Sequence, residues 1–158
     1  MRKKIRNPFN DEMNRCFACS EANPIGLKLK FEESEEFLHA IWEPSEYFQG
    51  YGNVIHGGII ATLLDEIGVW CTYIKAGTAC VTSELTIKYI KPVFISRGTV
   101  TLKAQIVDTT EKYARLHCWL FDSTGVLCAE SNANFFLYPE EIARRRLHYP
   151  GKEAFYYD

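Results

Sequence analysis

The fold of this chain is decided by the stretch His56–Glu66, whose sequence is HGGIIATLLDE. Two glycines follow the histidine, and an apolar run then continues to about Lys75. At about 100° per residue, seven apolar side chains fall on one face of a helix, which is typical of a helix that faces a core. These are Ile60, Leu63, Leu64, Ile67, Trp70, Cys71 and Ile74. We therefore expect a helix from residue 56 to about residue 75.

The opposite face of this helix carries small side chains and one carboxylate. Its members are Gly58, Ala61, Asp65, Gly68 and Thr72. A helix that is apolar on one side and small on the other is expected to be enclosed on both sides. Asp65 is therefore predicted to lie in a covered place. Glu66 falls about 100° further round the helix, so we expect it to point elsewhere.

The composition is that of one globular domain. The chain has 158 residues, of which 47% are hydrophobic and 14% aromatic, and this length is enough to bury a core. A formal charge of −2 argues against a nucleic-acid partner. We found no apolar run of membrane-spanning length, so no membrane partner is expected. Residues 1–8 are basic but lack the apolar stretch of a signal peptide, which favours a cytoplasmic location.

Alternating apolar patterns surround the central helix and predict a sheet. We expect strands at residues 27–31, 37–42, 81–90, 100–106, 113–121 and 126–138, a long loop at 44–55, and short helices within 7–22 and 139–146. This order predicts an α+β fold with a mostly antiparallel sheet. The chain divides into an N-terminal helix and turn segment (1–26), a main domain (27–138) and a C-terminal helix and tail (139–158).

Six cysteines are present, and the chain shows no export signal that would favour disulfides. Four of them lie inside apolar patterns and are interpreted as small buried side chains. Cys16 and Cys19 have the spacing of half a zinc site, but a second pair is missing and the four histidines are scattered. We therefore expect reduced cysteines, no bound metal and no cofactor.

Three motifs carry a resemblance to a known family. They are His56-Gly57-Gly58 with an acid nine residues after the histidine, the segment Cys16–Leu27, and the segment Val81–Pro92. Together they resemble the hotdog-fold acyl-CoA thioesterases of the phenylacetate-degradation (PaaI-like) type, over roughly residues 16–138. The resemblance implies a curved sheet wrapped around one central helix. It also implies that the Gly58 position polarises a thioester carbonyl and that the Asp65 position carries the catalysis.

Thioester hydrolysis requires a donor for the developing oxyanion and a base or nucleophile that delivers the new oxygen. Backbone N–H groups at a helix N-terminus meet the first need, and Gly57 and Gly58 would let a substrate approach them. Asp65 meets the second need, either by direct attack or by activating water. His56 is assigned an orienting role in preference to proton transfer, and the alternatives are that it caps the helix or hydrogen-bonds the preceding loop. Thr82 occupies a position where relatives carry a hydroxyl near the attacking water, and an ordinary strand residue is the alternative.

Coenzyme A would bring phosphates and require a positioned water. Lys88, Lys91 and Arg97 surround a turn at the end of a strand and are candidate phosphate contacts. Some relatives carry an asparagine six residues before the histidine, where this chain has Gly50. Asn53 or Gln49 is the candidate substitute for that amide.

The leading function is hydrolysis of acyl-CoA thioesters. The alternatives are a hotdog dehydratase or hydratase and a non-catalytic acyl-CoA binding or sensor protein. Gly58 and Asp65 are seven residues apart, which is about 10.5 Å along a helix, so one helix cannot bring both to one carbonyl. We therefore expect a homodimer with shared sites, and dimers that pair further into tetramers remain open. The small face of the helix is expected to permit close approach of the two copies.

Overall fold

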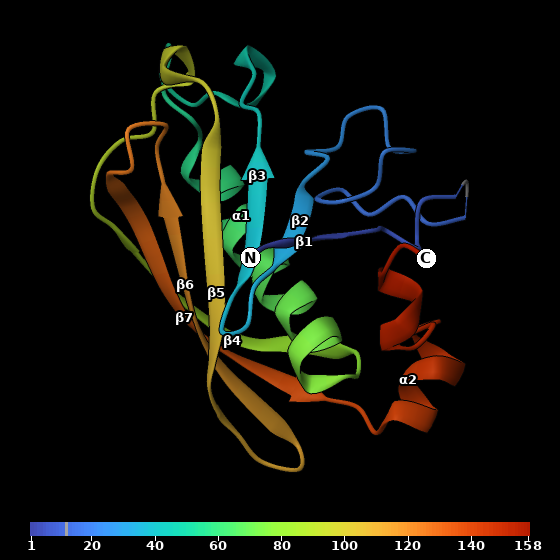
Figure 1. The fold of residues 1–158 in the computed structure, drawn as a ribbon. Coiled ribbons are helices and arrows are strands. Elements are labelled where there is room, and N and C mark those ends of the chain that lie inside the picture. The colour runs from blue at the N-terminus through green and yellow to red at the C-terminus, as the bar shows by residue number, and fades with distance from the viewer. Residues whose placement is uncertain (12) are drawn as a thin grey trace.

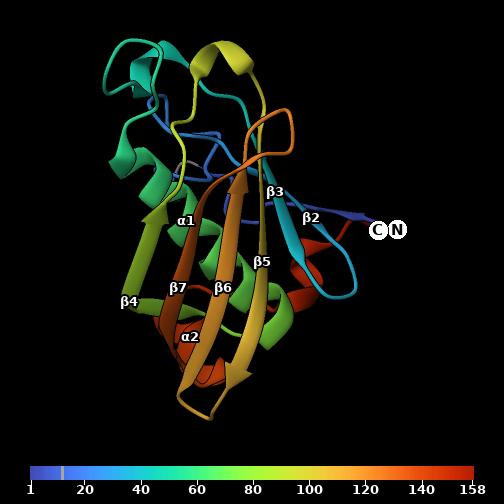
Figure 2. The same ribbon diagram turned by 90° about the vertical axis from the view of Figure 1, so that its left-hand side faces the viewer.

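An antiparallel sheet of seven strands curves around one long helix, as Figures 1 and 2 show. The computed structural model describes residues 1–11 and 13–158. The strands are β1 (Lys3–Ile5), β2 (Lys30–Glu33), β3 (Leu38–Trp42), β4 (Cys80–Tyr89), β5 (Val100–Thr109), β6 (Tyr113–Phe121) and β7 (Leu127–Leu137). The helices are α1 (Gly57–Cys71), a π-helical continuation η2 (Thr72–Ala76), α2 (Glu140–Arg146), and the short turns η1 (Glu46–Phe48), η3 (Ile95–Arg97) and η4 (Lys152–Phe155).

The strand order is β1-β2-β3-β5-β6-β7-β4, so β4 forms one edge of the sheet. All neighbouring strands pair antiparallel. A bulge between Thr82 and Glu84 interrupts the pairing of β4 with β7. The α+β fold class and the single central helix predicted from the sequence are confirmed.

The central helix begins where the sequence predicts. His56 is its N-cap residue, and the seven apolar side chains of the predicted face are all buried. After the π-helical turn, Gly77 ends the helix with a φ of 70°, a left-handed conformation that glycine adopts without strain. The periodicity of the sequence therefore set both the length and the phase of this helix.

The outer side of α1 is covered by the two ends of the chain (Figure 1). The indole of Trp70 stacks on Phe31 at 4.0 Å between ring centroids, and the Phe155 ring meets it edge-on at 5.4 Å. The stretch Gly57–Ala76 is long and apolar enough by composition to cross a membrane, contrary to the sequence-based expectation. Half of it is buried inside the protein, which is the behaviour of a core helix.

The C-terminal part of the small face of α1, at Gly68 and Thr72, packs against the chain's own sheet, whereas Gly58 at its other end is exposed. The close approach of a second copy along this face stays a prediction. A Cβ atom at Gly68 would lie 2.6 Å from the Phe135 ring on β7. Thr72 is fully buried and its hydroxyl donates to the Cys80 sulfur at 3.1 Å. Glycine is needed at position 68 because an aromatic ring occupies the space of a side chain.

The N-terminal segment differs from its prediction. Between residues 7 and 22 the described residues form turns instead of a helix. The side chains of Asn7 and Asp11 accept hydrogen bonds from backbone N–H groups two residues further on, which competes with helix formation. The strand expected from residue 27 begins at Lys30, because Lys28 has a left-handed φ of 61°. β1, which was not predicted, pairs with β2 and joins residues 3–5 to the sheet.

Candidate active site

Asp65 and Thr82 come together at the β4 edge of the sheet. Asp65 lies in the middle of α1, and Thr82 lies near the start of β4. The Thr82 hydroxyl donates a hydrogen bond of 2.7 Å to Oδ1 of Asp65. Asp65 is half-buried, whereas Thr82 is exposed. The carboxylate is therefore held in one orientation and still has a side open to a ligand.

The start of α1 forms the second part of the site. Nδ1 of His56 accepts a hydrogen bond of 2.9 Å from the Gly58 N–H, so the histidine caps the helix and its Nδ1 carries no proton. The amide predicted to polarise the substrate is thus already bonded. Gly57 is exposed, and its N–H has no bond among the described residues.

Tyr89, at the far end of β4, contacts this helix start. Its hydroxyl donates to the Gly57 carbonyl at 2.7 Å. A Cβ atom at Gly57 would lie 3.6 Å from the Tyr89 ring, which is an ordinary contact distance. Tyr89 falls within the strand predicted at residues 81–90, and no role at the site was predicted for it. The sequence feature that could have indicated this role is an aromatic residue at the end of the strand that also carries Thr82.

The two parts of the site lie far apart within one chain. Gly57 and Asp65 are eight residues apart in a continuous helix, which corresponds to about 12 Å of rise. An oxyanion donor and an attacking group must each reach the same carbonyl within about 3 Å. One copy of α1 therefore cannot supply both groups to one substrate.

The amides expected to position water are used inside the protein. The Asn53 side chain donates to the Ser96 hydroxyl at 3.0 Å and accepts from the Ser96 N–H at 2.9 Å. The side chain of Gln49 accepts from the Asn53 N–H at 3.2 Å. Asn53 therefore connects the loop before α1 to η3, and Gln49 bonds within that loop. The Asn53 side chain is thus engaged away from the helix start. A side chain at Gly50 would lie against His56, 3.4 Å from its Cα atom.

The structure places two of the three predicted phosphate contacts at one pocket and the third outside it. Lys91 and Arg97 line a surface pocket of about 480 Å³ next to the loop that precedes α1, since Val54 pairs with Phe94 there. Arg97 is bonded to Asp122 at 3.1 Å, which compensates its charge. Lys88 lies opposite Glu130 in the strand pairing and does not line this pocket.

Glu66 points away from the site, as its position on the helix predicts. Its carboxylate accepts from the Trp70 indole at 3.0 Å and lies 3.4 Å from the Cys16 sulfur. Trp70, which belongs to the apolar face of the helix, is fully buried on this side of α1. In the described part of the chain, the only group of His, Cys, Asp and Glu side chains close enough to share an ion is Cys16, Cys19 and Glu66.

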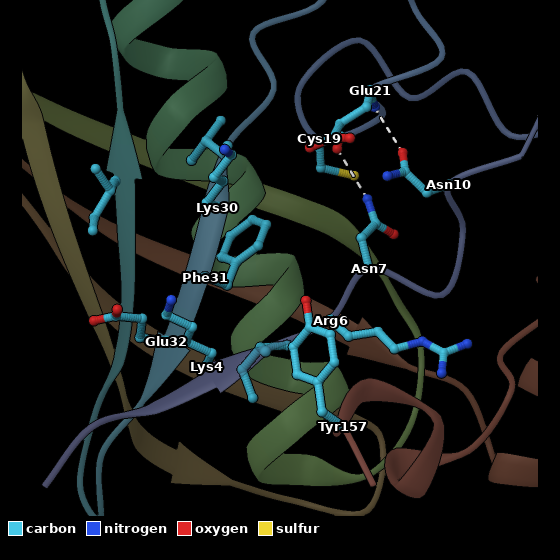
Figure 3. Close-up of a pocket in the computed structure, with 13 residues that line it drawn as sticks. Lys4, Arg6, Asn7, Asn10, Cys19, Glu21, Lys30, Phe31, Glu32 and Tyr157 are labelled. Carbon is cyan, nitrogen blue, oxygen red and sulfur yellow. Dashed lines mark hydrogen bonds between the residues drawn. The ribbon is translucent and has the colours of Figure 1, made fainter.

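A pocket of about 550 Å³ lies on the outer side of β2, apart from Asp65 (Figure 3). Lys4, Arg6, Lys30, Phe31 and Tyr157 are among its lining residues. None of the predicted site residues lines it. This pocket is therefore separate from the site that the sequence motifs predict.

The fold is that of a hotdog-type protein, and Asp65 and Thr82 form a polar site at the edge of its sheet. Residues 52–129 match the model of the thioesterase superfamily. An uncharacterised protein of Schizosaccharomyces pombe is 33% identical over 151 residues, which cover 85% of this chain and 81% of that protein. This chain belongs to the thioesterase superfamily, and its fold and family are those of thioester hydrolases.

Solved structures share this fold at low sequence identity. The PaaI protein of the Escherichia coli phenylacetic acid degradation operon is 19% identical with a TM-score of 0.66, covering 72% of this chain and 82% of that one. A Streptococcus mutans protein solved with acetyl CoA is also 19% identical, with a TM-score of 0.65, covering 71% and 90%. The fold expected from the family resemblance is thereby confirmed.

Proposed function

We propose that this protein hydrolyses acyl-CoA thioesters to a free acid and coenzyme A. The observation that carries this proposal is the hydrogen bond between Thr82 and Asp65, which orients a half-open carboxylate beside the edge strand. Membership of the thioesterase superfamily supplies the reaction class. The coenzyme A part of the substrate is supported by the related fold that was solved with acetyl CoA.

In this reaction Asp65 either supplies the attacking oxygen or activates the water that supplies it. A backbone N–H at the start of α1 stabilises the oxyanion. Either Asp65 attacks the thioester carbonyl directly or it removes a proton from an attacking water. We assign the donor role to Gly57 instead of Gly58, because the Gly58 N–H is already bonded to His56. The unpaired Gly57 N–H lies at the positive end of the helix dipole, where negative charge is favoured. His56 orients this helix start as its cap.

A complete site requires two copies of the chain. The edge of β4 is available for pairing, and its side chains are largely exposed, including Val81 at 42% and Tyr89 at 53%. In antiparallel pairing of two β4 strands, the Tyr89 end of one copy lies beside the Thr82 end of the other. Because Tyr89 contacts Gly57 and Thr82 contacts Asp65, this pairing brings a donor and an acid from different copies together. A homodimer formed in this way is therefore part of the proposal.

Lys91 is assigned to a coenzyme A phosphate. It lines the surface pocket beside the loop that precedes α1, and no ion pair of Lys91 occurs among the described residues. Arg97 and Lys88 are weaker candidates, since Arg97 is paired with Asp122 and Lys88 lies outside the pocket. Lys91→Ala should raise the KM for an acyl-CoA more than it changes kcat.

Release of free thiol from a panel of acyl-CoAs tests the proposed function. Asp65→Asn should lower turnover by a factor of hundreds, as expected when a base or nucleophile is removed. Glu66→Gln is the matched control one residue away, and it should keep most of the activity. Binding without thiol release would favour an acyl-CoA sensor, and loss of water from a 3-hydroxyacyl-CoA would favour a dehydratase. Either result would refute the hydrolase.

A further inference from the structure

Cys16, Cys19 and Glu66 form a compact group on the side of α1 that faces the N-terminal segment. Their Sγ and carboxylate atoms all lie within 4.8 Å of one another, although Glu66 is fifty residues from Cys16 in the sequence. The backbone between the cysteines makes a turn, in which the Ser20 N–H donates to the Cys16 carbonyl at 3.1 Å. The Asn7 side chain fixes the end of this turn by donating to the Cys19 carbonyl at 2.9 Å (Figure 3).

We propose that Cys16 and Cys19 are a redox-active dithiol that exchanges with low-molecular-weight disulfides and closes to an intramolecular disulfide. The two sulfurs are close together and anchored to a folded segment, so only a small displacement is needed to bond them. The group lies on the other side of α1 from Asp65 and Thr82. This chemistry is therefore separate from thioester hydrolysis.

The two cysteines differ in exposure, as an attacking and a resolving thiol should. Both thiols line a pocket of about 280 Å³, but Cys16 is half-buried whereas Cys19 is only 4% exposed. Arg15 also lines this pocket. Because Cys16 is the more exposed thiol, we assign the first attack to Cys16 and the resolving step to Cys19.

The ionisation of the group supports this division of roles. A hydrogen bond from the Cys19 thiol lowers the pKa of Cys16 to about 5, so Cys16 is a thiolate at neutral pH. The same hydrogen bond, together with burial, raises the pKa of Cys19. Burial raises the pKa of Glu66 to about 8, so its carboxyl group can hold and return a proton. Thiolates are the reactive species in disulfide exchange.

The exchange balances without a further reagent. The Cys16 thiolate attacks one sulfur of a disulfide RS–SR, the S–S bond breaks, and the leaving thiolate takes the proton of Glu66. The Cys19 thiol then gives its proton to the Glu66 carboxylate and attacks the Cys16 sulfur. This releases the second RS group as a thiolate. The two cysteines are oxidised, the small disulfide is reduced to one thiol and one thiolate, and Glu66 ends protonated as it began.

The alternative is that Cys16, Cys19 and Glu66 bind a metal ion. Structural zinc sites use four protein ligands, and no fourth His, Cys, Asp or Glu joins the three in the part of the chain that the structure describes. The pocket beside the sulfurs is lined largely by aromatic and apolar side chains, and Arg15 repels a cation. We therefore favour the dithiol and make metal retention an outcome of the test.

The experiment treats the reduced, native protein with oxidised glutathione in one arm and coenzyme A disulfide in the other. Intact mass and peptide mapping should show a Cys16–Cys19 disulfide in at least one arm, reversed by a dithiol reductant. Cys19→Ser should stop at a mixed disulfide on Cys16, and Cys16→Ser should not react. Cys118→Ser removes a fully buried thiol and is the matched control that should react like the wild type.

A second measurement needs no variant. The alkylation rate of Cys16 in the native protein should reach half its maximum near pH 5, far below the value for an ordinary thiol, about 8.5. Elemental analysis of the same sample should find no stoichiometric metal. The proposal is overturned if the two thiols remain unreactive in both arms, if the wild type stops at a mixed disulfide, or if about one tightly bound metal per chain blocks the reaction.

Discussion

The Thr82 hydroxyl and the Asp65 carboxylate, seventeen residues apart in the chain, are joined by a hydrogen bond of 2.7 Å. This bond links the edge strand β4 to the middle of α1. It fixes one oxygen of the carboxylate and leaves the other for an incoming group. The position of β4 therefore influences both the geometry of Asp65 and, in the proposed dimer, the arrangement of the shared site.

Replacement of Thr82 tests whether this bond matters for turnover. A hydrogen bond to a charged group contributes about 1.5–3 kcal/mol. Thr82→Val keeps the shape of the side chain and removes the donor, so kcat should fall about tenfold to a hundredfold. Thr82→Ser keeps the hydroxyl and should retain most of the rate. Equal rates in the valine and wild-type proteins would mean that Thr82 is only a strand residue.

The helix and its phase were predictable from local periodicity. Asp65 and Glu66 point in different directions from α1, as their separation of about 100° predicts, and the seven apolar positions are all buried. The packing of Gly68 was not predictable, because a row of small residues fits either a second helix or a large ring. The presence of Phe135 at that point depends on the pairing of β7 with β4.

The site was predicted less completely than the fold. The motif located the helix start and the acid, yet the bond from Gly58 to His56 depends on a side-chain rotamer that spacing does not define. The group around Cys16 was missed as a unit, since its carboxylate comes from a helix fifty residues later. Long-range contacts of this kind have no local signal in one sequence.

The contact of Gly68 with Phe135 predicts a cost for any side chain at position 68. The Phe135 ring is fully buried, and the new Cβ would lie 2.6 Å from it. Overpacking of a core costs about 1–3 kcal/mol, and the better helix propensity of alanine returns up to about 1 kcal/mol. Gly68→Ala should therefore lower the free energy of unfolding by up to about 2 kcal/mol in urea titrations.

The matched control for this change is Gly52→Ala, because a Cβ atom at that loop position meets nothing within 4 Å. Its free energy of unfolding should stay within about 0.5 kcal/mol of the wild type. An unchanged stability in Gly68→Ala would show that the packing cost is no larger than the gain of about 1 kcal/mol in helix propensity.

The pKa of Glu66 predicts a pH dependence of stability. Burial raises this pKa to about 8 in the folded protein, against about 4.3 in an unfolded chain. Between these values the folded state holds a proton that the unfolded state has released, so stability falls as pH rises through this window. Glu66→Gln carries no titrating group, and the wild type should lose stability relative to it between pH 5 and pH 8.

Urea midpoints of both proteins at pH 5 and pH 8 measure this difference. Glu36→Gln, which changes an exposed glutamate, is the control and should follow the wild type. A parallel pH dependence in wild type and Glu66→Gln would contradict the raised pKa.

Subunit mixing tests whether Gly57 and Asp65 act across two copies of the chain. Asp65→Ala lacks the acid, and Gly57→Val places a branched side chain where the substrate must approach the N–H. Each variant should be inactive alone. If sites are shared, a mixed dimer holds one intact site and one doubly damaged site. Random pairing makes about half of the dimers mixed, so about a quarter of the wild-type activity should return after co-refolding.

The matched control mixes Asp65→Ala with Asp65→Asn, which share the same defect and should stay inactive in every dimer. Size-exclusion chromatography with light scattering on the mixture verifies that dimers have formed. If the dimers form and no activity returns, each site lies within one chain. The oxyanion donor would then have to be another group near Asp65 in the same chain. Gly57 could not serve, because the helix rise places it about 12 Å from a carbonyl held at Asp65.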